Sequence, residues 1–228
     1  MSNEKTCAYF ITGTDTGCGK TLVSVALLEY FKAQGHSCLA LKPVATGSDN
    51  TSAGLRNADA LLLQQHSSVA LSYPDINPFV YQDPVSPHLA AAATGKPIVI
   101  AEIVDHFRRL QNRAQSIIIE GVGGWYAPLS PRFTVADMAS ALGIPVILVV
   151  GLRLGCLNHA ILSARAITQS GLPFAGWVAN TIDPVMACRQ ENIDTLCQII
   201  PAPLLASIPY HQETNTERSI PAFSFQRS

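Results

Sequence analysis

The segment GTDTGCGKT, residues 13–21, contains the residue types that bind phosphate. In a glycine-rich loop before a helix, backbone N–H groups point at phosphate oxygens, and the helix N-terminus adds positive potential. Lys20 would reach the terminal phosphates of a nucleotide, and Thr21 would offer its hydroxyl to Mg²⁺. Five residues separate Gly13 from Gly19, whereas the usual loop has four. The pattern predicts nucleotide binding and leaves the reaction open.

Two carboxylates are candidates for the same metal ion. Glu120 ends the apolar run SIIIE and is followed by GVGG, whose glycines let the backbone approach a ligand closely. Mg²⁺ usually takes few protein ligands, and a carboxylate at the end of a strand is a common one. Asp59 is the weaker candidate, because it could simply favour the dipole at the start of a helix. A surface position for Glu120 is the alternative.

Lys42 ends a second apolar run and is followed by Pro43. In open α/β sheets, ligands bind at the carboxyl edge, where such a lysine would point. Taken alone, Lys42 could equally be a surface residue. Together, Lys20, Lys42 and the carboxylates favour substrate chemistry, because a cation beyond the γ-phosphate could hold an anionic acceptor for phosphoryl transfer.

The elements that must position these residues follow from the hydrophobic pattern. Short apolar runs without alternation are typical of parallel strands that are covered on both faces. They alternate with helical segments. One of these begins near Gly19, and another extends over residues 157–171. This order predicts an α/β fold with a doubly wound, mostly parallel sheet flanked by helices. The expected strands are residues 8–12, 37–42, 116–120, 145–151, 174–180 and 203–209.

Length and composition limit the remaining possibilities. The 228 residues suit one large domain, expected over residues 1–210, with a polar tail of uncertain structure over residues 211–228. The net charge of −1 gives no general attraction to nucleic acid or to an anionic membrane. No apolar run could span a bilayer, and the N-terminus does not read as a signal peptide, so we expect a cytoplasmic protein. The six cysteines form no CxxC pair, and we expect buried or half-buried thiols at Cys7, Cys18, Cys38, Cys156, Cys188 and Cys197.

Taken together, these motifs resemble the dethiobiotin synthetase family. The resemblance covers residues 8–210, and the stretched glycine loop is that family's form. Its carriers are GTDTGCGKT, KPVATGS, GLRNADALLL, PVSPHLAA, IIIEGVGGWYAPL, PVILVVGLRLGCLNHA, GWVAN and IPAPLLASIPY. The resemblance implies a P-loop NTPase-like synthetase domain over residues 1–210.

The reaction implied by the resemblance is the Mg²⁺- and ATP-dependent carboxylation of 7,8-diaminononanoate with CO₂. It would pass through a carbamate and a carbamic-phosphoric anhydride, and ring closure would give dethiobiotin, ADP and phosphate. The resemblance further implies a homodimer in which the two subunits share their active sites.

The resemblance also implies a role for individual residues. Lys20 and Lys42 would be catalytic, and the metal ligands would be Thr21, Asp59 and Glu120. The diamine would bind to Lys42, Thr46, Gly155 and Asn158. ATP would bind to Gly13, Thr16, Gly17, Cys18, Gly19, Lys20, Thr21, Leu22, Asp59, Glu120, Gly121, Val122, Gly123, Asn180, Thr181, Pro209, Tyr210 and His211, with Asn180 and the last three at the adenine.

The sequence departs from the family at two of these positions. Gly17 stands where members often carry glutamate, which removes a side chain near the nucleotide. Thr46 stands where serine is common, and the hydroxyl is kept. No covalent nucleophile is needed, so Cys18 and Cys156 are expected to be small packing residues.

Two histidines and two tryptophans have other interpretations. His88 and His159 could be acid–base groups, although a histidine at a helix start is more often a capping or packing residue. Trp125 and Trp177 are expected in the core or in a pocket wall.

Two other functions compete with the synthetase. A partner-regulated ATPase of the partitioning or cell-division-positioning type carries an extra lysine near the start of its loop, where this chain has Thr14 and Asp15. Such ATPases often end in a basic amphipathic membrane helix, which this tail lacks. An amide-forming synthetase of the cobyric-acid type usually brings a glutaminase domain, for which 228 residues leave no room.

Overall fold

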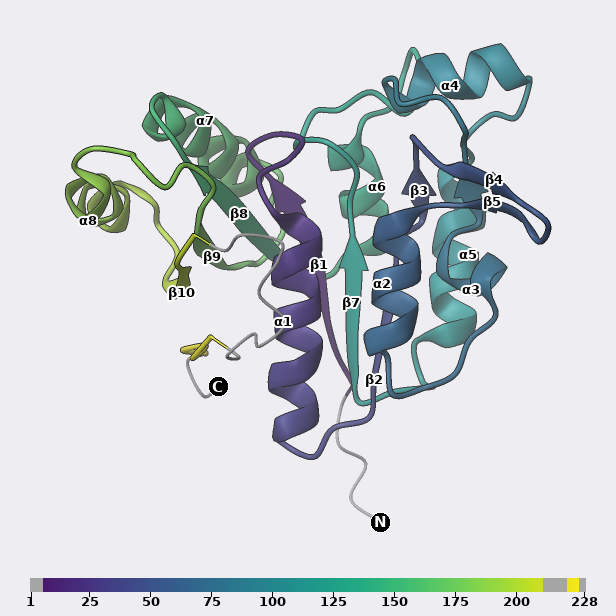
Figure 1. Cartoon of the computed structure of the whole chain (residues 1–228), viewed down its shortest axis with the longest axis horizontal. Coiled ribbons are helices and arrows are strands. Elements are labelled where there is room, and N and C mark those ends of the chain that lie inside the picture. Colours follow the sequence, from purple (N-terminus) through teal and green to yellow (C-terminus); the bar gives the residue numbers. More distant parts are fainter. Residues whose placement is uncertain (1–5, 211–220, 226–228) are drawn as a thin grey trace.

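A six-stranded sheet forms the centre of the molecule, and all of its neighbouring strands are parallel (Figure 1). The structure is a computed structural model that describes residues 6–210 and 221–225. The strand order is β10-β9-β8-β1-β7-β2. The strands are β1 (Cys7–Gly13), β2 (Cys38–Leu41), β7 (Ser116–Glu120), β8 (Val146–Leu152), β9 (Phe174–Thr181) and β10 (Leu204–Ile208). Each corresponds to one of the six expected runs, so the predicted doubly wound parallel sheet is confirmed.

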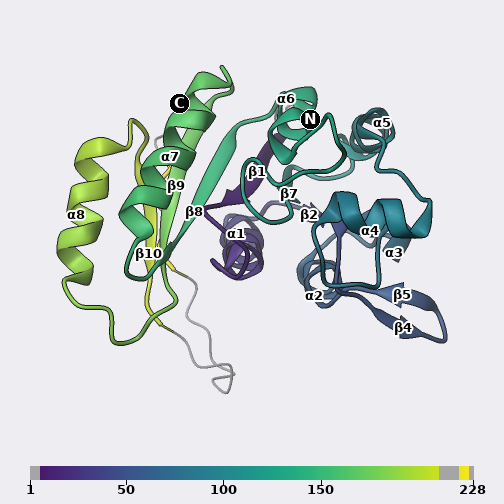
Figure 2. The ribbon, with the colours of Figure 1, turned by 90° about the horizontal axis from the view of Figure 1, so that it is seen from above.

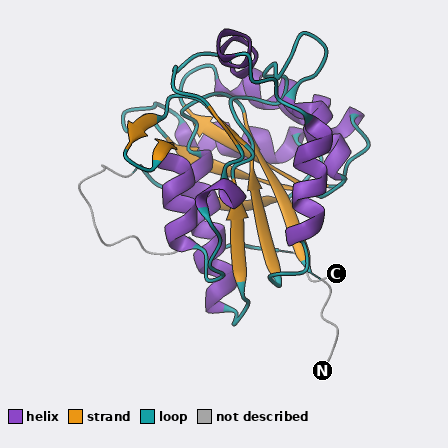
Figure 3. Cartoon of the chain, turned by 90° about the vertical axis from the view of Figure 1, so that its right-hand side faces the viewer, coloured by secondary structure: helices purple, strands orange, loops and turns teal. Residues whose placement is uncertain are grey.

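Helices cover both faces of this sheet, as the view from above shows (Figure 2). One face carries α1 (Lys20–Ala33) and α2 (Ala58–His66). At the β10 end of the sheet, α8 (Arg189–Ile199) packs beside α7 (Cys156–Gln169). The other face carries α5 (Ile100–Leu110), α6 (Val135–Leu142) and α7 (Cys156–Gln169). Figure 3 shows these layers with the strands between them. Within the described residues, no helix combines the length and hydropathy that crossing a membrane requires.

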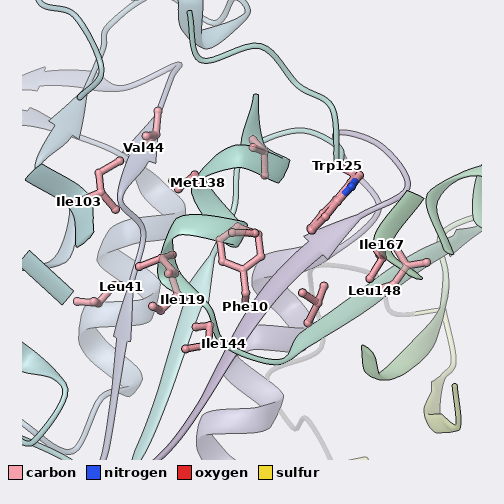
Figure 4. Packing of buried hydrophobic residues seen from close by; sticks show 14 of the residues in the cluster. Phe10, Leu41, Val44, Ile103, Ile119, Trp125, Met138, Ile144, Leu148 and Ile167 are labelled. Carbon is pink, nitrogen blue, oxygen red and sulfur yellow. The ribbon is translucent and has the colours of Figure 1, made fainter. Parts of the chain in front are cut away.

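The two faces of the sheet have separate hydrophobic cores because successive strand residues point to opposite sides. Phe10 packs with the residues beneath α5, α6 and α7, whereas Ile11 packs with those beneath α1. Figure 4 shows the first core around Phe10, Ile119 and Met138. Trp125 and Trp177 are 3% and 0% exposed, which confirms their expected place in the core.

Between β2 and β7 the chain makes a long excursion beside the carboxyl edge of the sheet (Figure 1). The sequence pattern did not predict these short elements. They form a parallel pair, an antiparallel hairpin and two short helices. They are β3 (Val44–Ala45), β4 (Asp49–Thr51), β5 (Gly54–Arg56), α3 (Tyr73–Ile76), β6 (Phe79–Val80) and α4 (Pro87–Thr94).

The described part of the C-terminal tail packs against the domain. The N–H of Ser224 donates to the carbonyl oxygen of Leu205 at 2.9 Å. The rings of Phe223 and Phe225 lie against Tyr30, with centroids 5.4 and 5.7 Å away. Residues 221–225 therefore add to the core over α1, although the sequence left the structure of the tail open.

The expectation for the cysteines is wrong at two positions. Cys7 is half-buried and Cys18, Cys38 and Cys156 are buried, as expected. Cys188 and Cys197 are exposed. Cys188 is the N-cap of α8, and Cys197 lies within the helix. This helix buries Ile193 and Leu196 and leaves most of its other side chains in solvent.

Candidate active site

The glycine loop lies at the carboxyl edge of the central strand. β1 ends at Gly13 between its neighbours β7 and β8, and α1 begins at Lys20. Gly19 has a φ of 93°, and a Cβ there would lie 2.0 Å from Nδ2 of Asn180. That amide donates to the carbonyl oxygen of Cys18 at 2.9 Å. Only glycine fits this position, and its missing side chain lets Asn180, the penultimate residue of β9, lie directly against the loop.

A cluster of opposite charges lies beside the loop. The Lys42 ammonium donates to Oε1 of Glu120 at 2.5 Å and to Oδ2 of Asp59 at 3.0 Å. The Thr21 hydroxyl donates to the same Glu120 oxygen at 2.9 Å. Lys42 and Glu120 are 4% and 0% exposed, so Glu120 is a buried site residue and the surface alternative is wrong. Four segments meet here: the end of β7, the residue after β2, the start of α2 and the start of α1.

The electrostatics of the cluster favour charged forms. Burial disfavours the ammonium of Lys42, but the carboxylates of Glu120 and Asp59 outweigh it and raise the pKa of Lys42 above its ordinary value. Burial likewise favours the neutral acid at Asp59, but the Lys42 ammonium outweighs it and lowers the pKa of Asp59. Lys42 is therefore a cation at neutral pH and not a free base.

A cavity of about 760 Å³ opens above the loop and the charged cluster. Many of the expected site residues line it, including both lysines. They are Thr16, Gly17, Gly19, Lys20, Thr21, Lys42, Thr46, Asp59, Val122 and Gly123. Other expected residues do not line it: Gly13, Cys18, Leu22, Glu120, Gly121, Gly155, Asn158, Asn180, Thr181, Pro209 and Tyr210. Of these, Glu120 still contacts two lining residues, Thr21 and Lys42.

The residues expected at the adenine lie at the ends of two neighbouring strands. Ile208 of β10 pairs with Asn180 of β9, so Pro209 and Tyr210 continue past the strand end next to Thr181. Asn180 reaches the glycine loop through its hydrogen bond to Cys18. Its Oδ1 is buried with no hydrogen-bond partner among the described residues, so the amide retains an acceptor. The expected contact at His211 lies outside the described residues.

The residues expected at the far end of the diamine lie apart from the cavity. Gly155 is the N-cap of α7, with a φ of 93°, and Asn158 is exposed one turn into the helix. This segment is nevertheless tied to the glycine loop. The Arg153 guanidinium donates to Oδ2 of Asp15 at 2.7 Å, and the Gly151 N–H donates to the Thr14 hydroxyl at 3.4 Å.

Sequence reasoning missed Asp15 as a structural centre of the loop. Its carbonyl oxygen accepts from the Lys20 ammonium at 3.0 Å, and its Oδ1 accepts from the Thr16 N–H at 2.8 Å. With the Arg153 contact, Asp15 shapes both ends of the loop. The missed wall of the cavity is Asn57, Pro84, Val85, Ser86, Pro87, Gly124, Ala127 and Pro128. These residues lie in the motifs GLRNADALLL, PVSPHLAA and IIIEGVGGWYAPL, which could have directed attention to them.

Neither histidine lines the main cavity. His88 is the second residue of α4 and lines a separate cavity of about 240 Å³. His159 is exposed on α7. Cys18 and Cys156 are 1% and 2% exposed and pack in the two cores, as expected of small packing residues.

The arrangement can hold a polyphosphate and a divalent cation. Backbone N–H groups, the Lys20 ammonium and the start of α1 supply positive potential at the loop. Carboxylate and hydroxyl oxygens are the ligands that Mg²⁺ prefers. Oε2 of Glu120 is buried and has no hydrogen-bond partner among the described residues, which suits a cation ligand. The remaining lysine, Lys42, lies where a second anion could be held.

Comparisons with known proteins identify the family to which this site belongs. A family model described as an AAA domain matches residues 7–218. The chain is 48% identical over 205 residues to the ATP-dependent dethiobiotin synthetase BioD 1 of Escherichia coli strain K12, with 90% of this chain and 91% of that protein covered. It is 46% identical over 212 residues to the ATP-dependent dethiobiotin synthetase BioD of Pseudescherichia vulneris, with 93% and 88% covered.

Among solved structures, the chain is similar to the septum site-determining protein MinD of Pyrococcus horikoshii OT3, which was complexed with Mg-ADP. The TM-score is 0.55 at 17% identity, and 90% of this chain and 81% of that chain are covered. At this identity the likeness shows the fold alone, a P-loop NTPase-like sheet. The competing ATPase class thus matches in fold, whereas the synthetases match in sequence over nearly the whole length. The chain belongs to the ATP-dependent dethiobiotin synthetase family.

Proposed function

We propose that the chain catalyses the Mg²⁺- and ATP-dependent conversion of 7,8-diaminononanoate and CO₂ to dethiobiotin, ADP and phosphate in biotin biosynthesis. The observation that carries the proposal is the Lys42 ammonium. It lines the same cavity as Lys20 and is held at 2.5 and 3.0 Å from two carboxylates. A nucleotide-hydrolysing site needs the loop and a metal ion, whereas a second buried cation suits an anionic acceptor of the phosphoryl group.

ATP would bind along the carboxyl edge of the sheet. The loop from Gly13 to Leu22 would hold the phosphates, with Lys20 at the γ-phosphate. Gly121, Val122 and Gly123, which follow β7, would border the nucleotide from the side. Asn180 and Thr181, with Pro209–His211, would bind the adenine, because the Asn180 amide has a free buried acceptor beside the loop.

Thr21, Asp59 and Glu120 would hold Mg²⁺ through their oxygen atoms. When bound, the ion neutralises charge on the phosphate oxygens during transfer. The support is the donor set itself, because the Thr21 hydroxyl lies 2.9 Å from the Glu120 carboxylate and Asp59 shares Lys42 with it. Lys42 would then lean from the carboxylates toward the substrate.

The chemistry joins one carbon atom to two nitrogens. One amine of the diamine adds to CO₂, which gives a carbamate and releases a proton. A carbamate oxygen attacks the γ-phosphorus of ATP and ADP leaves, so a carbamic-phosphoric anhydride forms. The neighbouring amine attacks the carbonyl carbon of this anhydride and loses a proton, and the bond from that carbon to the phosphate oxygen breaks, so that phosphate leaves as the cyclic urea closes. No protein nucleophile takes part.

The protein residues act on charge and position. Lys42 would hold the carbamate as a cation, since its raised pKa keeps it protonated. Lys20 would neutralise the charge that builds on the transferring phosphoryl group. The Thr46 hydroxyl would lie at the diamine. Pro84, Val85 and Pro87 form an apolar wall of the cavity and would keep water from the reactive anhydride.

The active site would be shared between the subunits of a homodimer. Gly155 and Asn158 do not line the cavity of their own chain, and Leu154 beside them is 94% exposed. The Cys156 N–H already donates to the Arg153 carbonyl oxygen at 3.0 Å. The other N–H groups in the first turn of α7 would suit a carboxylate, and the diamine has one at the end of its aliphatic chain. We infer that α7 of one subunit binds the carboxylate of the diamine whose amines lie at Lys42 and Thr46 of the other. The partners are small molecules and a second copy, and the place of action is the cytoplasm.

Product analysis tests the proposed function. The purified protein is incubated with ATP, Mg²⁺, bicarbonate and 7,8-diaminononanoate, and dethiobiotin, ADP and phosphate are quantified by mass spectrometry and ion chromatography. We expect equal amounts of the three products, and no ADP when the diamine or bicarbonate is left out. ADP release at the same rate with and without the diamine and bicarbonate would overturn the proposal in favour of a regulatory ATPase.

A further inference from the structure

A chain of buried hydrogen bonds runs behind the charged cluster. The Tyr73 hydroxyl accepts from the Asn57 N–H at 2.7 Å and donates to Oδ1 of Asn77 at 3.0 Å. Asn57, Tyr73 and Asn77 are 6%, 7% and 1% exposed. Burial raises the pKa of Tyr73, so its hydroxyl keeps the proton that it donates. Tyr73 itself comes from α3, in the excursion that the sequence pattern did not predict.

One end of this chain holds the backbone of Lys42. Nδ2 of Asn77 donates to the Lys42 carbonyl oxygen at 2.7 Å. The Lys42 N–H in turn donates to the carbonyl oxygen of Ile76 at 2.8 Å. Both backbone polar groups of the lysine are thus bonded to the end of α3. These two hydrogen bonds hold the backbone of Lys42 at the sheet edge, and its side chain contacts Asp59 and Glu120 at the cavity.

The other end holds the start of α2, where Asp59 lies. Asn57 is the N-cap of α2, and its Oδ1 accepts from the Ala60 N–H at 3.2 Å. Its Nδ2 also faces the carbonyl oxygens of Thr46 and Gly47 at 3.3 and 3.4 Å. One tyrosine hydroxyl therefore connects the residue that caps the Asp59 helix with the residue that binds the Lys42 backbone.

We propose that Tyr73, acting with Asn57 and Asn77, is a positioning residue that sets the separation of Lys42 and Asp59 at the cavity. The inference rests on the proposed function for its kinetic readout. Tyr73 does not line the cavity, so it would act through Lys42, Asp59 and the Thr46 backbone. Loss of one hydrogen bond should disturb the rest of this network, because a buried donor or acceptor that loses its partner must find a new one.

The test is Tyr73→Phe, which removes the hydroxyl and keeps the ring. We expect kcat for dethiobiotin to fall on the order of 10- to 100-fold, since a shift of about 1 Å in a site can cost that much. KM for ATP should change little, because the glycine loop is held by Asp15 and Asn180 instead. A fall in kcat without a matching rise in the KM for ATP separates positioning from a general loss of folded protein.

Tyr81→Phe is the matched control. Tyr81 is 2% exposed, and its hydroxyl donates to the carbonyl oxygen of Lys96 at 2.8 Å, away from the cluster. The same atom is lost from a similar depth, so kcat should stay near the wild-type value. Asn57→Ser gives a second variant, because serine can still cap α2 but is too short to reach the Thr46 carbonyl. It should also lower kcat. An equal kcat for the Tyr73→Phe and wild-type enzymes, or an equal fall in both tyrosine variants, would overturn the proposal.

A structural readout keeps this inference separate from the proposed function. Crystal structures of the wild-type and Tyr73→Phe proteins should differ in the distance from Nζ of Lys42 to Oδ2 of Asp59, which is 3.0 Å here. The Lys20 contact with the Asp15 carbonyl should not change. If the wild-type protein made no dethiobiotin, the proposed function would fail, and this comparison would still decide the positioning role. An unchanged Lys42–Asp59 distance in the variant would end it.

Discussion

Lys20 and Lys42 are both buried, but they have different neighbours. Lys20 contacts a carbonyl oxygen of its own loop, whereas Lys42 contacts two carboxylates from other segments. The first ammonium can leave its weak partner for a phosphate at little cost. The second is held by charge at the place where an acceptor would lie. This difference is the reason we propose a nucleotide role for Lys20 and a substrate role for Lys42.

The two lysines can be separated by measuring nucleotide affinity and ring closure independently. Lys20→Ala should lower turnover by roughly 10²–10³, because one preorganised charge-stabilising group is lost at the γ-phosphate. Lys42→Ala should harm dethiobiotin formation more than ATP binding, measured by calorimetry.

The control for both lysines is Lys32→Ala, a half-buried lysine on α1 paired with Glu29, which should stay active. Circular dichroism must show that Lys42→Ala still folds, since Glu120 loses its buried ion partner. Ring closure at the wild-type rate in Lys42→Ala would remove that residue from the mechanism.

The carboxylates give a prediction about Mg²⁺. Glu120→Gln and Asp59→Asn each remove a charge while keeping size, so the Mg²⁺ concentration for half-maximal rate should rise in both. Asp49→Asn, on the exposed hairpin strand β4, is the control and should titrate like the wild type. Unchanged Mg²⁺ titrations in both site variants would mean that the metal ion is held elsewhere.

At the scale of elements, the strands could be predicted and the excursion could not. β7 and β8 are continuous β-branched runs, and burial on both faces requires that pattern. The residues that end these strands, such as Glu120, could therefore be assigned to the carboxyl edge in advance. The pairs β3–β6 and β4–β5 have two or three residues per strand, too few for any periodicity to register.

The same limit explains which site residues were missed. Asp15 acts through its backbone carbonyl and through a side-chain contact with the distant Arg153. Tyr73 joins Asn77, the C-cap of its own helix, to the more distant Asn57. Neither role leaves a local pattern. The structure of the tail was open for a similar reason, because Phe223 and Phe225 lie in a polar stretch and pack against Tyr30 of α1 and Tyr9 of β1, which are distant in sequence.

Helix α6 gives a pH-dependent prediction at this scale. The Thr134 hydroxyl and N–H both donate to Oδ2 of Asp137 at 2.7 Å and lower the pKa of Asp137 from its ordinary 3.8. The folded state thus favours the charged form of Asp137, and the carboxylate stabilises the fold fully at pH values above its ordinary pKa. This stabilisation is lost as the pH falls through the lower pKa of Asp137 in the folded state.

Asp137→Asn should therefore reduce the free energy of unfolding by about 0.3–1 kcal/mol at pH 7, the usual effect of a charge near a helix N-terminus. Urea unfolding at a series of pH values should show this difference vanish in acid. Asp105→Asn on α5 is the control, because its 3.4 Å ion pair is exposed and should contribute little at any pH. A difference that grows on acidification would contradict the assignment of the charge.

At the scale of the whole molecule, the α7 loop connects two functions. Arg153 and Gly151 bind the glycine loop, while Gly155 and Leu154 face outward. A partner that covers this surface would therefore touch the same segment that contacts the nucleotide loop. This exposed surface is the basis for our proposal of a two-fold dimer in which each subunit would complete its neighbour's site.

Subunit mixing tests the shared site. Lys42→Ala and Asn158→Tyr should each be inactive as homodimers. In a mixed dimer both defects would fall in one site and leave the second intact, so activity should return to about one working site per dimer. His-tagged and untagged chains purified together establish that mixed dimers have formed. Mixed dimers without any recovered activity would favour a site built from one chain, and the enzyme assignment would stand.

In the proposed reaction, the phosphoryl group of ATP passes to a carbamate in this cavity. The most direct measurement follows an oxygen atom from freshly dissolved ¹⁸O-labelled CO₂ in ordinary water, in a reaction stopped before the label exchanges. The carbamate oxygen that attacks phosphorus remains on the phosphate when the ring closes. We therefore expect one ¹⁸O atom in the released phosphate for each dethiobiotin formed. Unlabelled phosphate alongside labelled dethiobiotin would show that water, and not a carbamate, had accepted the phosphoryl group.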